Sequence, residues 1–299
     1  MDKSFEVIIV GGSYAGLSAA LALGRSMRKT LVIDAGHPCN SPTPYSHNFL
    51  TQDGVPPTEI SSVAKSQVEQ YDTVHFYNDF AIEGNKTTED YTIQTQDGSI
   101  FSAQKLIFAT GLKDIMPEIE GFAQCWGKSV VHCPYCHGYE VRYKKTGILA
   151  NGEKANHYAT LISNWTKDLT IFTNGPSTLT EDQTKRITNH QIPIIQTPVK
   201  NIGHVDGQVQ NILLEDDSEH TIDVIYSGPD FVQHSNIPEQ FGCEINEHGL
   251  LVVDGFQMTN IPGIYACGDN STMRSVALAV ASGTKAGVVA NKELIEEVF

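Results

Sequence analysis

The chain has 299 residues, of which 40% are hydrophobic and 18% are charged, and its formal net charge is −15. This length predicts one large or two ordinary domains with a real core. Because a phosphate backbone binds a basic surface, the acidic balance argues against nucleic acid as a partner. The sequence has no apolar run of membrane-spanning length, and its acidic first residues do not resemble a signal peptide. We therefore expect a cytoplasmic protein without a membrane anchor.

The first part of the chain has the pattern of a dinucleotide-binding unit. A β-branched run over 5–10 predicts a buried parallel strand, and a glycine-containing turn then leads into an Ala/Leu-rich helix. A second strand over 30–33 ends in Asp34, 23 residues after Gly11. This arrangement predicts a pyrophosphate at the helix start and a carboxylate on the ribose hydroxyls. Ser13 replaces the middle glycine of the motif, so a tight turn without a ligand stays an alternative.

A loop over 36–57, rich in Pro, Ser, Thr and Asn, follows the second strand and contains Cys39, His47 and Asn48. Loops of this length in a compact domain are usually functional or mobile. In a fold of this kind the loop would run toward the isoalloxazine end of a bound flavin. Cys39 is either a third redox thiol or, as is commoner for a lone cysteine, an inert one.

The most reactive-looking stretch contains Cys133 and Cys136, which are the closely spaced pair among six cysteines. Two cysteines at this spacing can close a small disulfide ring, and Cys136 lies at a predicted helix start, where a thiolate is favoured. His137 can exchange a proton with the pair, whereas His132 is a weaker candidate. The pattern also matches c-type haem attachment and a crowded zinc site. Haem attachment would require export and zinc would require further ligands, so we favour dithiol–disulfide chemistry and expect no metal.

The second half repeats the strand–turn–helix pattern in an eroded form. A strand that ends in Ala150 is followed by a turn at 151–155 and by a helix over 157–164. Ala150 stands at the first glycine position of the motif. The 2′-phosphate of NADPH requires a nearby cation, and residues 173–175, after the next strand, offer none. Lys154 could reach a phosphate, but a lysine in such a turn is more often only solvated.

Near the C-terminus, a strand over 261–266 leads to Gly268 and Asp269, and a long helix begins near Arg274. A carboxylate between a strand end and a helix start suits a ribityl hydroxyl. The helix N-terminus suits the electron-rich edge of a flavin. Alone, Gly268-Asp269 would be an ordinary turn.

Together and in this order, these features resemble the low-molecular-weight thioredoxin reductase family of FAD-dependent pyridine nucleotide-disulfide oxidoreductases. The resemblance covers essentially the whole chain. It rests on the N-terminal glycine turn with Asp34, on Ala109-Thr110-Gly111, on Cys133-x-x-Cys136, and on Gly263-x-Tyr265-Ala266-x-Gly268-Asp269.

The resemblance implies an α/β fold with two Rossmann-like three-layer nucleotide-binding domains. The FAD domain is split between 1–116 and 241–299, and a central NAD(P)H-like domain over 117–240 carries the cysteine pair. A homodimer is also implied, with Cys136 facing the flavin and Cys133 exchanging with substrate. The implied FAD-binding residues are Gly11, Ser13, Tyr14, Ala15, Gly16, Asp34, Ala35, His47, Asn48, Ala109, Thr110, Gly111, Gly268, Asp269, Arg274, Ser275 and Val276.

Two departures from the family pattern resemble its dithiol oxidase branch. His137 replaces the acid after the cysteine pair, and the NADPH fingerprint is eroded at 150–155 and 173–175. That branch closes disulfides in small dithiols and returns the electrons to oxygen. We therefore expect dithiol–disulfide exchange through Cys133 and Cys136 without efficient NADPH use, or a reductase fed by a ferredoxin-type donor. In this reaction His137 would be the base, and its charged imidazole would lower the thiol pKa values. The alternatives are NADPH-dependent reduction of a thioredoxin-like protein and a flavin-dependent redox sensor without turnover.

Overall fold

The two ends of the chain build one α/β domain around a seven-stranded sheet in the computed structural model, which describes residues 2–88 and 90–299. The strands β3-β2-β1-β6 and β17 run parallel, whereas β5 and β4 continue the sheet in antiparallel pairing. The strands are β1 (Ser4–Val10), β2 (Thr30–Asp34), β3 (Val74–Asn78), β4 (Ala81–Lys86), β5 (Tyr91–Thr95), β6 (Ile100–Phe108) and β17 (Ile264–Ala266).

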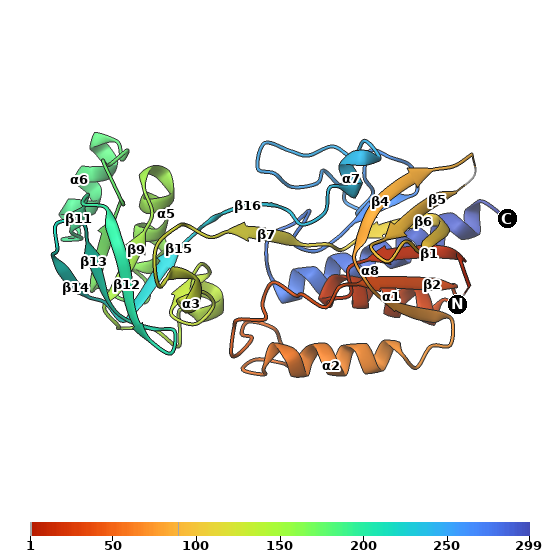
Figure 1. The fold of residues 1–299 in the computed structure, drawn as a ribbon, viewed down its shortest axis with the longest axis horizontal. Coiled ribbons are helices and arrows are strands. Elements are labelled where there is room, and N and C mark those ends of the chain that lie inside the picture. The colour runs from red at the N-terminus through yellow and green to blue at the C-terminus, as the bar shows by residue number, and fades with distance from the viewer. Residues whose placement is uncertain (1, 89) are drawn as a thin grey trace.

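Both faces of this sheet are buried, which explains the continuous apolar runs in its parallel strands. Successive residues of β1 alternate between two cores, with Val7 in one and Ile8 in the other. The helices α1 (Tyr14–Arg25) and α8 (Val276–Glu296) cover one face side by side (Figure 1). They cross closely, because a Cβ at Gly283 would come within 2.0 Å of the Ala15 carbonyl oxygen. Helix α2 (Pro57–Val68) packs beside α1.

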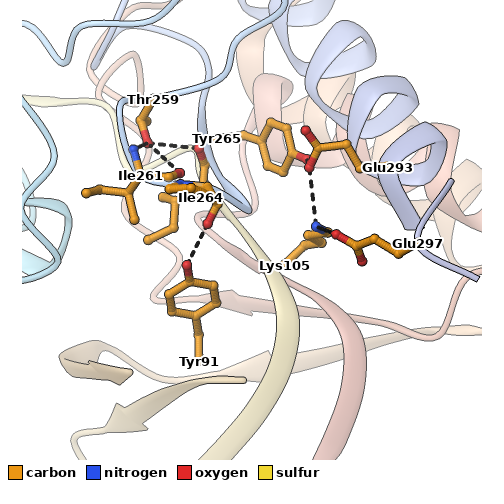
Figure 2. A network of polar contacts seen from close by, with 9 residues as sticks. Tyr91, Lys105, Thr259, Ile261, Ile264, Tyr265, Glu293 and Glu297 are labelled. Atoms are coloured by element: carbon orange, nitrogen blue, oxygen red, sulfur yellow. Dashed lines mark hydrogen bonds and ion pairs between the residues drawn. The ribbon is translucent and has the colours of Figure 1, made fainter. Parts of the chain in front are cut away.

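A polar network fixes the C-terminal half of α8 to β6 (Figure 2). The Lys105 ammonium, which is buried, lies 3.3 Å from the Glu293 carboxylate and 2.5 Å from that of Glu297. The Tyr265 hydroxyl donates a hydrogen bond to Glu293. Because strand β17 contributes Tyr265, the contacts join β6 to β17 and α8, which lie far along the chain from it.

The middle of the chain forms a second α/β domain, seen as a separate lobe in Figure 1. Its parallel sheet has the order β11-β10-β9-β15-β8, and a three-stranded antiparallel sheet, β12-β13-β14, lies beside it. The parallel strands are β8 (Val130–Val131), β9 (Thr146–Leu149), β10 (Leu169–Phe172), β11 (Ile194–Ile195) and β15 (Val224–Ser227). The other strands and the helices are β12 (Val199–Val205), β13 (Gln208–Leu214), β14 (Glu219–Thr221), α3 (Phe122–Cys125), α4 (Pro134–His137), α5 (Gly152–Ile162) and α6 (Glu181–Asn189).

A two-stranded antiparallel ribbon joins the two lobes (Figure 1). It pairs β7 (Leu112–Ile115) with β16 (Asp230–Gln233), and the chain returns through α7 (Ile237–Gln240) to the first domain. The predicted α/β class is therefore confirmed. In the described part of the chain, no helix combines the length and hydropathy needed to cross a membrane.

The structure differs from the sequence prediction at two helices of the central domain. Helix α5 begins at Gly152 rather than at 157, because the Asn151 side chain accepts a hydrogen bond from the Gly152 N–H and caps the helix. Helix α6 was not predicted, although Thr180 and Gln183 form a complete capping box at its start.

Candidate redox site

The cysteine pair lies on a short helix directly after strand β8. Cys133 is the N-cap residue of α4, and Pro134 is its first helical residue. The amide groups of Cys136 and His137 donate hydrogen bonds to the Cys133 carbonyl oxygen at 3.2 and 3.1 Å. Both cysteines are partly exposed free thiols. The strand fixes the position of Cys133, and the single turn of helix brings Cys136 back beside it.

The proton of the reduced pair resides on Cys136. The Cys136 thiol donates a hydrogen bond to Cys133 and, with the amide groups of Cys136 and Tyr135, lowers the pKa of Cys133 to about 7. The hydrogen bond to Cys133, burial and the charges of Cys133 and Asp269 raise the pKa of Cys136. The prediction that the helix start favours a thiolate at Cys136 was therefore wrong. Cys133, rather than Cys136, is the N-cap residue of α4.

The two histidines that flank the pair are neutral near pH 7. Burial lowers the pKa of His137 to about 4, and burial has the same effect on His132. The expectation that a charged His137 would lower the thiol pKa values is therefore wrong, since an imidazole in this environment holds no extra proton. A neutral imidazole can still accept a proton from an incoming thiol.

The predicted dinucleotide turn lies where the parallel strands of the first domain end. Gly11 has φ +105°, and a Cβ there would come within 2.3 Å of the Ala109 carbonyl oxygen, so only glycine fits. The Gly12 amide donates a hydrogen bond to the Asp34 carboxylate at 2.9 Å. Through these contacts the structure brings three predicted segments together at one edge of the sheet: residues 11–16, Asp34–Ala35 and Ala109–Gly111.

The starts of α1 and α8 fit the anionic and electron-rich parts of FAD. The first turn of each helix contains no acidic residue. Within the described residues, neither N-cap residue, Ser13 or Ser275, caps its helix through its side chain. The first amide groups of both helices therefore remain available to a ligand. Asp269 lies between β17 and α8, and burial raises its pKa.

Several predicted cofactor residues have protein partners in this structure. Arg274 forms an ion pair with Asp114 at 2.8 Å and also lies over the ring of Phe231, so it ties the ribbon to the first domain. The His47 ring lies between Asp53 and Glu140, at 3.6 and 3.7 Å. These partners were not predicted, because each contact joins segments that are far apart in sequence or lies within an irregular loop.

The remaining loop residues differ in their neighbours. The Asn48 amide donates a hydrogen bond to Asp53 at 2.7 Å within the loop. The Cys39 thiol donates one to the Asp269 carboxylate at 3.7 Å. Desolvation and the Asp269 charge raise the pKa of Cys39 to about 12, so this thiol is a poor nucleophile at neutral pH.

The nucleotide turn of the central domain is occupied by its own side chains. The Asn151 side-chain oxygen accepts hydrogen bonds from the amide groups of Gly152 and Thr178, each at 2.8 Å. Across the carboxyl ends of β9 and β15, the Lys154 ammonium lies 2.7 Å from Asp230 and 3.3 Å from the Gly228 carbonyl oxygen. In an open α/β sheet, the crevice at this point is the usual nucleotide site.

At the end of β10, polar groups are likewise engaged with the protein. The Thr173 hydroxyl donates a hydrogen bond to the Gly175 carbonyl oxygen at 2.7 Å, and the Asn174 side chain accepts one from the Val199 amide at 2.8 Å. Residues 173–175 carry no positive charge. This loop therefore has no cation of its own for a 2′-phosphate.

Comparisons with known proteins agree over the full length of the chain. A family model described as pyridine nucleotide-disulphide oxidoreductase matches residues 5–283. The thioredoxin reductase tcpT of Claviceps purpurea is 32% identical and covers 98% of this chain and 95% of its own. The structure of an oxidoreductase from Agrobacterium tumefaciens is 36% identical, with a TM-score of 0.91 over 98% of this chain and 99% of that one. A putative thioredoxin reductase from Bacillus anthracis is 28% identical, with a TM-score of 0.94 over 99% and 100%.

Proposed function

We propose that this chain, which belongs to the pyridine nucleotide-disulphide oxidoreductase family and is a thioredoxin reductase-like FAD enzyme, oxidises small dithiols through Cys133 and Cys136 without efficient use of NADPH. The observation that carries the proposal is the self-occupied turn of the central domain. Asn151 uses its side-chain oxygen on the protein's own amide groups, where a phosphate would bind in a working site.

The Lys154 contacts support the same conclusion. Its ammonium is directed to Asp230 and to a backbone carbonyl rather than left free for a phosphate. The ion pair between Lys154 and Asp230 is exposed and therefore weak, but residues 173–175 also lack a positive charge for the phosphate. A dinucleotide phosphate would have to displace these contacts and would gain no arginine from residues 173–175 in return.

The reaction conserves atoms and electrons through two exchange steps. A substrate thiolate attacks the Cys133 sulfur of the enzyme disulfide, the bond to Cys136 breaks, and Cys136 leaves as a thiolate. The second substrate thiolate then attacks the substrate sulfur of the mixed disulfide and expels Cys133. The substrate has now lost two protons and two electrons, and the enzyme pair is reduced. When bound, FAD would supply the acceptor for this electron pair, and the two electrons together with the two protons would reduce dioxygen to hydrogen peroxide.

The acidity of Cys133 favours the oxidase direction. A thiol with a lower pKa is a better leaving group in thiol–disulfide exchange, and stabilising the reduced pair makes the enzyme disulfide a stronger oxidant. Because the pKa of Cys133 is about 7, this residue leaves the mixed disulfide as a thiolate near neutral pH. Neutral His137 is placed one residue after Cys136 and serves as the base that accepts the substrate proton.

A second candidate is NADPH-dependent reduction of a thioredoxin-like protein, which the names of the relatives favour. Reduction by a ferredoxin-type donor would also be compatible with an eroded NADPH turn. We also propose that the protein is a homodimer and that its domain boundaries lie at 116/117 and 240/241. All of these candidate functions use the cysteine pair, and they differ in the electron donor and acceptor.

The test is oxygen consumption and peroxide formation with dithiothreitol as the dithiol and with NADPH in a parallel assay. We expect turnover with dithiothreitol and little with NADPH. Cys136→Ser should abolish turnover while FAD remains bound, whereas Cys243→Ser, a buried cysteine outside the pair, should remain active. An active Cys136→Ser protein would contradict the assigned role of the pair, and fast NADPH turnover would favour the reductase.

A further inference from the structure

The loop between β2 and α2 contacts the central domain close to the cysteine pair. The His47 Nε2 atom lies 3.7 Å from the Glu140 carboxylate. The Glu140 amide donates a hydrogen bond to the His137 carbonyl oxygen at 3.2 Å, so Glu140 is attached to the end of α4. The loop also touches this domain at Gly127, where an added Cβ would meet Pro42 at 3.0 Å. The two lobes therefore meet beside the redox helix as well as through the ribbon.

The loop presents His47 from a defined position. The Ser46 amide donates a hydrogen bond to the Val55 carbonyl oxygen at 2.9 Å, and the Gly54 amide donates one to Ser46 at 2.8 Å. Asp53 lies 3.6 Å from His47 Nδ1 and accepts the Asn48 amide at 2.7 Å. The His47 side chain is 19% exposed, so the surrounding chain restricts its orientation.

Both ring nitrogens of His47 face carboxylates, one from Asp53 and one from Glu140. The ring therefore bridges the loop and the residues that follow α4, through Nδ1 to Asp53 and through Nε2 to Glu140.

We propose that His47 and Glu140 form a cross-domain ion pair that holds α4 against the FAD-binding half, which makes Glu140 a positioning residue for electron transfer from Cys136. The inference rests on the proposed use of the cysteine pair. It assigns His47 a partner in the central domain rather than a direct cofactor contact. Because the Glu140 side chain is 42% exposed, the pair contributes modestly, and its loss should lower the equilibrium constant for docking about two- to fivefold.

The test is a double-mutant cycle on the holoenzyme with Glu140→Gln, His47→Gln and the combined variant. One readout is the rate of anaerobic flavin reduction by dithiothreitol at low and high salt. The other is the radius of gyration from small-angle X-ray scattering, which reports domain separation without catalysis. Glu247→Gln is the matched control, since Glu247 lies 3.6 Å from His248 in a contact between neighbouring residues away from the pair.

We expect each single variant to reduce the flavin about two- to fivefold more slowly, to lose the salt dependence of the wild type and to have a larger radius of gyration. The combined variant should be no slower than the slower single variant. Multiplying effects, an unchanged radius or wild-type behaviour of Glu140→Gln would each overturn the inference. Neither readout uses NADPH or oxygen, so an error in the proposed function would leave this test intact. Thermal unfolding of each variant identifies any loss of fold.

Discussion

The Cys136 thiol donates a hydrogen bond to the Cys133 sulfur, and this contact is the largest cause of the lowered pKa of Cys133. The first prediction follows from it. The alkylation rate of the reduced protein should rise with a midpoint near pH 7, since Cys133 is protonated below that value and a thiolate above it. In Cys136→Ala the midpoint should move toward the ordinary cysteine range near 8.5. Mass-spectrometric detection of alkylated Cys133 across pH measures both midpoints, and equal midpoints would show that the contact is unimportant.

The second prediction concerns His137. Replacing it with Asn should lower turnover with dithiothreitol about 100-fold, because the substrate thiol loses its proton acceptor. Since the pKa of His137 is about 4, the imidazole is unprotonated throughout pH 5–8, and its protonation should limit the rate only at lower pH.

A pH–rate series for the wild type and for His137→Asn tests this role. His132→Asn is the comparison, because His132 is also neutral but was the weaker candidate base. A smaller effect is expected for this variant. If both variants lose activity equally, the specific role of His137 is wrong.

The third prediction concerns the anchor of α8 shown in Figure 2. Lys105→Met should lower the free energy of unfolding by about 1–3 kcal/mol, since it leaves two carboxylates without their cation. Glu293 and Glu297 are 23% and 53% exposed, so water compensates part of this loss.

Urea unfolding of the FAD-loaded protein measures the change. Glu296→Gln on the same helix is the control, because Glu296 pairs only weakly with Lys292 at 3.5 Å across an exposed turn. Its change should stay within about 0.5 kcal/mol. Similar losses in both variants would contradict the stabilising role of the Lys105 network.

The sequence predicted the nucleotide-binding elements well where local pattern determines structure. The run over 5–10, the turn at Gly11 and the position of Asp34 are set by strand hydrophobicity and glycine geometry, and all three are found at one sheet edge. Helix α6 was also detectable, because its capping box is visible in the sequence at Thr180 and Gln183. The start of α5 was misplaced because a glycine after Asn151 was interpreted as a turn.

The chemistry of the site depended on tertiary structure and was harder to predict. The relative acidity of Cys133 and Cys136 depends on the hydrogen bond between them and on their burial. The charge of His137 follows from burial, which the sequence does not show. The contact between His47 and Glu140 joins two segments with no shared local pattern. Residue types thus identified the reactive pair, whereas folding determined its protonation and its neighbours.

The most direct measurement is the flavin absorbance of the anaerobic protein after addition of excess NADPH or, separately, of dithiothreitol. We predict bleaching of the flavin by dithiothreitol and recovery of the colour in air. Bleaching by NADPH should be slow, because Asn151 and Lys154 occupy the nucleotide turn with their own contacts. Fast bleaching by NADPH would contradict the central claim and would identify a thioredoxin reductase with a divergent nucleotide site.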